Sequence, residues 1–410
     1  MTANGVKDER LFVEDRLERL AARLTSGRPQ DGFDFALGRT TPHPAALFGA
    51  RLAVENNVQH ATVRSAGVWL TEERQALAQL ADFLGTETKS AVPTSGGAEA
   101  LLVALFYALD AALPDYRTRG ISSAKVRIYL SQEGHAAVAK AARLLGLGDD
   151  AVVRVRLRDD GAIDPNDLTD RIGKDLAAGF TPVAIVATIG TTVDGALDDL
   201  DRLTTIAASR RLWLHADAAW GGILPFAPDG DAWRARFRRC SSVSVDPHKT
   251  FHCPLGLGVL YTDRPRGNAL RVDAAYVPKE DDPPWAQGIP WSRGAIALPL
   301  VALLAALGAG GFAALVGDAF RRADRLRTAI GHEGVAVADA PLPIVTLAET
   351  GRGGAAALVE ALASCKYRTS PVRFASGKLG VRIGLFDHAI PDDALDGLAR
   401  AIGAFYRKPT

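Results

Sequence analysis

Residues 182–217, PVAIVATIGTTVDGALDDLDRLTTIAASRRLWLHAD, contain two short apolar runs separated by a segment with helical spacing. The runs are PVAIVATI (182–189) and RLWLHAD (211–217), and the helical segment is 198–210. A run that is apolar at nearly every position predicts a strand covered on both faces, and an intervening helix is typical of parallel strands. This segment therefore predicts the repeating unit of an α/β fold.

The same alternation continues on both sides of this unit. Further apolar runs are KVRIYLS (125–131), AVVRVRL (151–157), SSVSVD (241–246) and LGVLYT (257–262), with helical stretches such as 135–146 between them. They predict a mostly parallel sheet with helices on both faces, in which ligands bind beyond the carboxyl ends of the strands. We expect an N-terminal segment (1–84), a large domain (85–265) and a connecting segment followed by a small C-terminal domain (266–410).

The flanking regions have patterns of their own. Helical spacing is found at 9–25 and at 71–84, the second opened by Thr71 as the expected N-cap, while 26–46 has loop composition. Residues 266–294 are polar and rich in proline, which predicts an irregular connection. The remaining pattern predicts a smaller α+β domain, with helices at 295–307, 312–330, 353–364 and 392–406 and strands at 342–347 and 380–385.

Composition excludes several classes of protein. The net charge of +1 and the 23% charged residues do not favour nucleic acid or an anionic membrane as partner. Cys240, Cys253 and Cys365 lie far apart, so we expect neither a metal site nor disulfides. The start of the chain is polar, and the apolar stretch 295–316 is alanine-rich and broken by glycines, which favours a packed helix over a membrane span. These features predict a soluble, cytoplasmic protein.

Two loops at predicted strand ends contain residues that suit chemistry. The turn TSGGAEA (94–100) precedes an apolar helix, and it fits either a phosphate site at a helix N-terminus or an ordinary tight turn. The segment HADAAWGG (215–222) places Asp217 at the end of an apolar strand, where a carboxylate needs a positive partner or serves as a helix N-cap.

A third strand-end loop, DPHK (246–249), ends in Lys249. A lysine at this place is either a surface cation, the usual case, or a nucleophilic amine that forms a Schiff base with a carbonyl group. The residues by themselves leave both interpretations open.

Five motifs in fixed order point to one family. They are TSGGAEALLVAL (94–105), SQEGHAAVAKAARLLGLG (131–148), ATIGTTVDGALDDL (187–200), HADAAWGG (215–222) and SVDPHKT (244–250). Together they resemble the group II pyridoxal-phosphate (PLP) dependent amino-acid decarboxylases of the fold type I, aspartate aminotransferase-like superfamily. The length of the chain and the stretch HPAALFGARLAVENN (43–57) are more similar to the short tyrosine/aspartate decarboxylases than to the longer animal enzymes.

The resemblance implies an α/β fold with a mostly parallel seven-stranded sheet, PLP as cofactor, and a homodimer with active sites at its interface. It implies three catalytic residues: Lys249 as the Schiff-base lysine, Asp217 as the partner of the pyridinium nitrogen, and His135 stacked over the ring. It also implies cofactor contacts from Gly96, Gly97, Ala98, Thr192, Ala219, Ser244 and His248. Substrate contacts are expected from Arg382, His43 and Tyr276, although Arg382 also fits an ordinary surface arginine.

The activity implied by the resemblance is decarboxylation of an L-amino acid to its amine and CO2, through an external aldimine and a quinonoid. Alternatives are a carbon–carbon lyase, an aldehyde-forming oxidative deaminase, and an inactive scaffold homologue. Two positions depart from the family: Ala98 stands where most members have Ser or Thr, and the segment 277–290 has no tyrosine to donate the final proton. The expected donor is then His135, Tyr276 or a group of a partner subunit.

Overall fold

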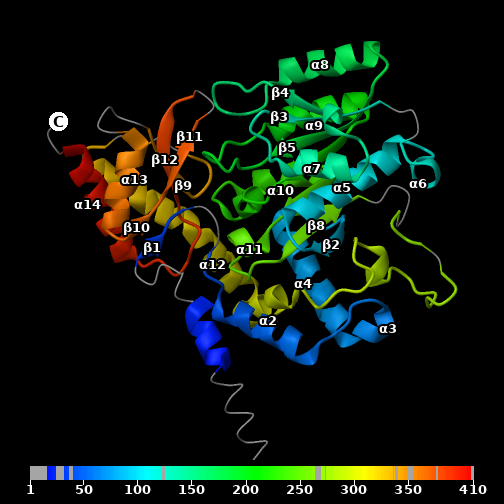
Figure 1. Cartoon of the computed structure of the whole chain (residues 1–410), viewed down its shortest axis with the longest axis horizontal. Coiled ribbons are helices and arrows are strands. Elements are labelled where there is room, and N and C mark those ends of the chain that lie inside the picture. The colour runs from blue at the N-terminus through cyan, green and yellow to red at the C-terminus, as the bar shows by residue number, and fades with distance from the viewer. Residues whose placement is uncertain are drawn as a thin grey trace, which may run out of the picture.

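The computed structural model describes residues 16–24, 32–36, 40–121, 125–263, 269–272, 274–335, 337, 340–348, 354–374 and 377–407. Figure 1 shows a large sheet with its helices and, beside it, a smaller unit formed mainly by the end of the chain. The long helix α12 (Leu298–His332) runs from one unit to the other. The predicted α/β fold class is confirmed.

The large sheet has seven strands in the order β2-β8-β7-β6-β5-β3-β4. Only β8 runs against the others, so the sheet is mostly parallel. Six of its strands fall on the predicted apolar runs: β3 (Val126–Ser131), β4 (Val152–Val155), β5 (Thr181–Thr188), β6 (Trp213–Asp217), β7 (Ser242–Val245) and β8 (Gly258–Thr262).

The seventh strand, β2 (Ser90–Thr94), was not predicted from the apolar pattern. It is short and contains Pro93, which cannot donate a ladder hydrogen bond. Because β2 lies at the edge of the sheet, only β8 needs its hydrogen bonds, and the proline is tolerated.

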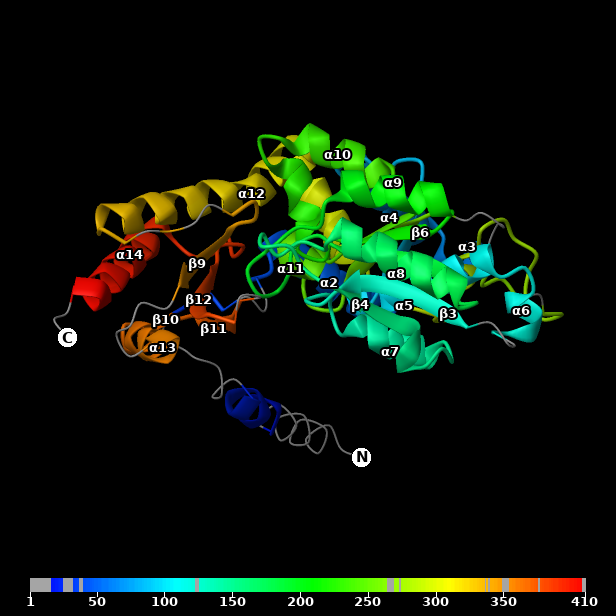
Figure 2. The same ribbon diagram turned by 90° about the horizontal axis from the view of Figure 1, so that it is seen from above.

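Helices bury both faces of this sheet, as the view in Figure 2 shows. Ile128 and Leu130 of β3 pack with α5 (Gly97–Ala112) and α7 (Ala137–Leu144), whereas the intervening Tyr129 packs in the core of the opposite face. That second core contains side chains of α4 (Val68–Leu84), α8 (Pro165–Ala177), α9 (Leu200–Arg210), α10 (Gly230–Arg238) and α12. Each fully buried Leu or Ile contributes roughly 1.5–3 kcal/mol, so both faces stabilise the strand positions.

The smaller unit is built around a three-stranded antiparallel sheet. Its strands are β11 (Ser370–Arg373), β12 (Leu379–Gly384) and β9 (Ile344–Ala348), in that order, packed with α13 (Gly354–Ser364), α14 (Asp392–Arg407) and the second half of α12. A short parallel pair joins β1 (Phe33–Asp34) to β10 (Tyr367–Arg368). An N-terminal strand therefore completes the C-terminal unit.

Three local expectations need correction. Thr71 is not an N-cap, because α4 begins at Val68 after Gly67. The expected loop 26–46 ends earlier, since α2 (Pro44–Asn56) begins with Pro44 in its first turn and His43 as its N-cap. The expected helices 295–307 and 312–330 form one element, with a non-helical residue at Gly308 (φ 63°) where the break was expected. Of the expected helix 9–25, only 16–24 lies within the described residues and is helical.

Within the described part of the chain, α12 alone is long and apolar enough to cross a membrane. Length and apolar composition are weak evidence, because core helices of soluble proteins share them. Here α12 packs against α2 and α14.

Candidate active site

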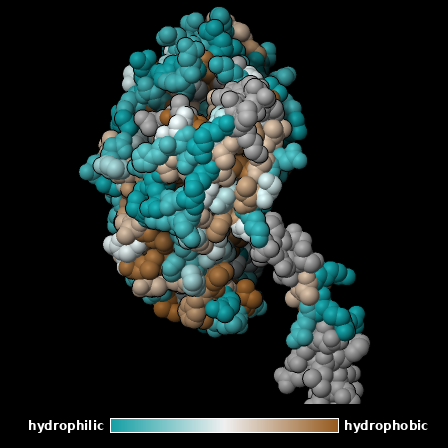
Figure 3. Space-filling view, turned by 90° about the vertical axis from the view of Figure 1, so that its left-hand side faces the viewer, coloured by the Kyte–Doolittle hydropathy of each residue, from teal (hydrophilic) through white to brown (hydrophobic). Residues whose placement is uncertain are grey.

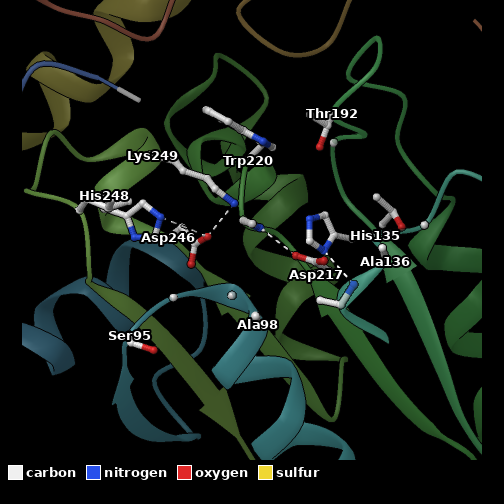
Figure 4. Close-up of a pocket in the computed structure, with 18 of the residues that line it drawn as sticks. Ser95, Ala98, His135, Ala136, Thr192, Asp217, Trp220, Asp246, His248 and Lys249 are labelled. Atoms are coloured by element: carbon white, nitrogen blue, oxygen red, sulfur yellow. Dashed lines mark hydrogen bonds and ion pairs between the residues drawn. The ribbon is translucent and has the colours of Figure 1, made fainter. Parts of the chain in front are cut away.

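The carboxyl ends of five strands meet at one edge of the large sheet. The loops after β2, β3, β5, β6 and β7 enclose a cavity of about 620 Å³ (Figure 4). Of the predicted site residues, Gly96, Gly97, Ala98, His135, Thr192, Asp217, Ala219, His248 and Lys249 line it. Segments more than 150 residues apart in the chain are brought together by the parallel strand arrangement.

Lys249 lies on the short helix α11 (Pro247–Thr250) and points into the cavity, about one quarter exposed. Its Nζ is 2.7 Å from Oδ2 of Asp246 and 5.4 Å from the centre of the Trp220 ring. Asp246 is 1% exposed, and its Oδ1 has no hydrogen-bond partner among the described residues. The amine therefore lies at the mouth of a buried, anionic environment.

Asp217 is the last residue of β6 (Trp213–Asp217) and lines the same cavity as Lys249. Burial raises the pKa of its carboxyl group, the charge of Lys249 opposes this, and the charge of Asp246 adds to it. Its Oδ1 accepts a hydrogen bond of 3.3 Å from the N–H of Ala219, and it forms no ion pair with any described residue. Because a buried carboxylate without an ion-pair partner is costly, this position favours a cationic ligand.

The loop 95–98 offers the backbone donors of a helix N-terminus. Helix α5 starts after Gly96 without a side-chain cap, and Gly97 and Ala98 line the cavity. Gly96 has φ 146°, and a Cβ at Gly97 would lie 3.2 Å from Oδ2 of Asp246. The close approach of backbone and cavity, together with the positive end of α5, suits a phosphate group.

His135 follows β3, and its ring orientation is defined by one hydrogen bond. Its Nδ1 accepts the N–H of Ala137 at 3.1 Å. Because this nitrogen is an acceptor, the proton of the neutral ring is on Nε2. His135 therefore offers a hydrogen-bond donor to the cavity that it lines.

Two predicted phosphate contacts differ in their placement. His248 lines the cavity, with Nδ1 2.7 Å from the carbonyl oxygen of Leu257 and Nε2 3.7 Å from Oδ2 of Asp246. Ser244 is buried within β7, and its Oγ is 3.3 Å from Nε2 of His215 instead. The structure does not bring Ser244 into the cavity lining.

The three residues predicted to contact the substrate lie in different parts of the structure. Arg382, on β12, donates through Nη1 to the carbonyl oxygen of Thr192, so it reaches a cavity-lining loop from the smaller unit. Burial lowers the pKa of Arg382, and its Nε is without a partner among the described residues. His43 caps α2 and its ring lies 5.7 Å from that of His388. Tyr276 is 81% exposed and does not line the cavity of its own chain.

Sequence reasoning assigned no role to several residues that form this cavity. Asp246, Trp220, Leu255 and Gly256 all line it. Asp246 could have been predicted as a site residue from the sequence, because it comes at the end of an apolar run as Asp217 does. In the described residues, no group of three or more His, Cys, Asp or Glu side chains could hold a metal ion.

Comparison with known proteins agrees with this geometry. Residues 35–338 match the pyridoxal-dependent decarboxylase conserved domain. A glutamate decarboxylase-like protein of Gibberella zeae is 33% identical over 64% of this chain and 51% of its own length, and the cysteine sulfinic acid decarboxylase of Rattus norvegicus is 32% identical over 58% and 49%. The chain spans about half the length of the curated relatives it matches.

A solved structure shows the same fold. The structure of Oryza sativa TDC with PLP and tryptamine superposes with a TM-score of 0.86 at 21% identity, covering 96% of this chain and 87% of that one. With three quarters of the chain inside the matched domain, and with a lysine, a buried aspartate and a glycine turn around one cavity, the chain belongs to the pyridoxal-dependent decarboxylase family.

Proposed function

We propose that this chain decarboxylates an L-amino acid to its amine and CO2, with PLP as cofactor. The observation that carries the proposal is that one cavity is lined by both Lys249, an amine, and Asp217, a buried carboxylate with a raised pKa. When bound, PLP supplies an electron sink for the bond that breaks at the substrate's α-carbon. The region 85–265 would form the cofactor-binding domain.

The protein's own groups would bind and orient. Lys249 would hold the cofactor aldehyde, Asp217 would accept a hydrogen bond from a protonated ring nitrogen, and the N–H groups of Gly97 and Ala98 would hold the phosphate. The Nε2–H of His135 would donate a hydrogen bond at the reacting end of the substrate. Ala219, 9% exposed, leaves room for a flat ring where a larger side chain would fill the cavity.

The test of this proposal uses spectra and products. Wild type loaded with PLP should show an absorbance band near 420 nm that borohydride removes, and Lys249→Ala should lack that band. Asp217→Ala should keep PLP bound and lose most of its turnover, because the ring nitrogen loses its counter-ion. An Asp217→Ala variant with near-normal turnover, or a wild type without the band, contradicts the proposal; the second result would favour an inactive scaffold.

Product analysis separates decarboxylation from the two alternatives. Amine with CO2 is expected, whereas aldehyde with ammonia or peroxide indicates an oxidative deaminase, and carbon–carbon cleavage gives an aldehyde without CO2. Three of the matched relatives are named for aspartate, cysteine sulfinic acid and acidic amino acids, so a screen of amino acids should begin with acidic ones.

We further propose that the chain is a cytoplasmic homodimer. Helix α2 exposes Leu47, Phe48 and Val54, and it packs against the apolar α12. Figure 3 shows hydrophobic surface gathered toward the end of the molecule where these helices lie in Figure 1. A second copy that covers this surface would explain it. Light scattering after size exclusion should give twice the mass of one chain; a monomer at micromolar concentration would contradict the dimer.

The source of the final proton is proposed to lie in a second copy. His135 already uses its Nδ1 to accept the N–H of Ala137, which leaves only Nε2 facing the cavity, so we look for the proton donor elsewhere. Tyr276 is exposed in its own chain and so is free to serve the cavity of a partner. Tyr276→Phe should lower the yield of amine relative to other products, and an unchanged product ratio would exclude it.

A further inference from the structure

Arg154 connects β4 to the turn that follows the neighbouring strand β3. Its Nη1 donates to the carbonyl oxygens of Gly134 at 2.7 Å, Ser131 at 3.2 Å and Gln132 at 3.4 Å. The side chain is half-buried and forms no ion pair among the described residues. The two N–H groups of one guanidinium nitrogen are therefore shared among three carbonyls of a single turn.

This turn needs such a donor because its carbonyl groups converge. The N–H of Gly134 bonds back to the carbonyl of Ser131 at 3.0 Å, which closes the turn and leaves these oxygens on one side. The turn is also tightly packed: a Cβ at Gly134 would lie 2.6 Å from Cδ1 of Leu130. Hydrogen bonds from a charged donor are shorter and stronger than neutral ones. Without Arg154, the turn would be joined to β4 by a backbone bond from the Gln132 N–H to the Val155 carbonyl at 3.0 Å.

The residue that the turn delivers is His135. Immediately after the tethered carbonyl of Gly134, the His135 ring enters the cavity and accepts the Ala137 N–H on Nδ1. That bond exists only while the backbone from 134 to 137 keeps its present path. The ring direction and the position of its proton thus depend on the turn.

We propose that Arg154 is a positioning residue: by holding the carbonyls of Ser131, Gln132 and Gly134 it fixes His135 as the Nε2–H tautomer that faces the cavity. Arg154 is not among the residues that line the cavity, and its effect on turnover rests on the proposed function. Its effect on the His135 ring does not, because the hydrogen bonds involved lie within the protein alone.

The first experiment measures the ring directly in the enzyme without PLP. Nitrogen-15 NMR of histidine-labelled protein reports which ring nitrogen carries the proton, and comparison with His135→Asn identifies the signal among the eight histidines. Wild type should show a single Nε2–H tautomer. Arg154→Gln should show averaging between tautomers, and Arg154→Lys, which keeps a charged donor, should restore most of the wild-type signal.

Arg156 offers a matched control two residues along the chain. Its guanidinium is 64% exposed and pairs with Asp167 on the surface, 3.2 Å away. Arg156→Gln removes the same group from the same strand end and should leave the His135 signal unchanged. Arg154→Met is a second disruptive variant, so that poor folding of one does not prevent the measurement.

A second readout follows PLP binding. The circular dichroism of the bound cofactor's visible band should fall at least twofold in Arg154→Gln, and kcat should fall about tenfold with a smaller change in KM. A wild-type tautomer in both disruptive variants would overturn the assignment. If the tautomer changes but no 420 nm band forms even in wild type, the positioning role stands and the proposed function fails.

Discussion

The substitution Gly258→Ala tests whether the glycine turn is built for close approach. Gly258 begins β8 and pairs with Thr94 of β2, so its Cα lies directly under the loop that leads to α5. A Cβ there would be 2.6 Å from Cα of Gly96, 2.7 Å from Oγ1 of Thr94 and 2.8 Å from the carbonyl carbon of Gly96. Two of these three atoms are backbone, so the collision is relieved only by moving the loop.

The size of the effect follows from this collision. Forcing one methyl group into a packed site costs about 1–3 kcal/mol. If the displaced loop is the one that holds the phosphate, this cost appears as roughly 5- to 150-fold weaker PLP binding. Any part that is not expressed in binding should appear as a lower melting temperature of the protein without PLP.

Titration of PLP into the apoenzyme, followed by tryptophan fluorescence, measures the dissociation constant. The matched control is Gly173→Ala in α8, where a Cβ meets nothing within 4 Å. That change should leave PLP binding unaltered and stabilise the helix by about 0.5–1 kcal/mol. A Gly258→Ala protein with wild-type PLP affinity and wild-type melting temperature would refute the steric reasoning.

Two further predictions concern buried charges. Burial alone would raise the pKa of Glu73, but hydrogen bonds from His60 and Arg293 hold it below its usual value. Arg293→Met leaves the buried carboxylate with His60 as its remaining partner and should lower the free energy of unfolding in urea by about 3–5 kcal/mol. A loss below about 1 kcal/mol would contradict this. Burial raises the pKa of Asp198 from 3.8 to about 6, so the folded state holds this proton more tightly than the unfolded state. The free energy of unfolding contributed by this proton is complete below about pH 4 and falls by about 3 kcal/mol as the pH rises to about 6. Asp198→Asn should lack this fall. Parallel curves of stability against pH for the wild type and Asp198→Asn would argue against this prediction.

The apolar runs predicted most of the large sheet because both faces of it are buried. A strand in that environment is apolar at nearly every position, as residues 182–189 are, and no tertiary information is needed to recognise it. The edge strand β2 was not predicted because Pro93 disfavours a strand when the local sequence is considered alone. Proline is tolerated in β2 only because this strand lies at the edge of the sheet. The start of helix α2 was not predicted because its N-cap is His43, and histidine is not among the usual N-cap residues.

The location of candidate site residues could be predicted where it follows from position along a strand. Lys249 and Asp217 both follow apolar runs, so the rule on strand ends places them at one edge. The structure places Ser244 outside the cavity lining because it lies within β7, with its Oγ next to His215. The reach of Arg154 to the turn at 131–134 could not be predicted, since a long side chain on one strand can contact any neighbour and strand order was unknown.

Strand register explains why the cavity has two carboxylates with different environments. Asp217 pairs in register with Ser244 of the adjacent strand, and Asp246 lies two residues beyond Ser244. With strands about 4.8 Å apart and a rise of about 3.3 Å per residue, the α-carbons of Asp217 and Asp246 are separated by roughly 8 Å. One acid can then contact the amine of Lys249 while the other forms no ion pair within the described part of the chain. A slip of β7 by one residue would turn the side chain at 246 to the other face of the sheet and remove this division, so the register of β6 and β7 determines the site as much as the identity of the acids does.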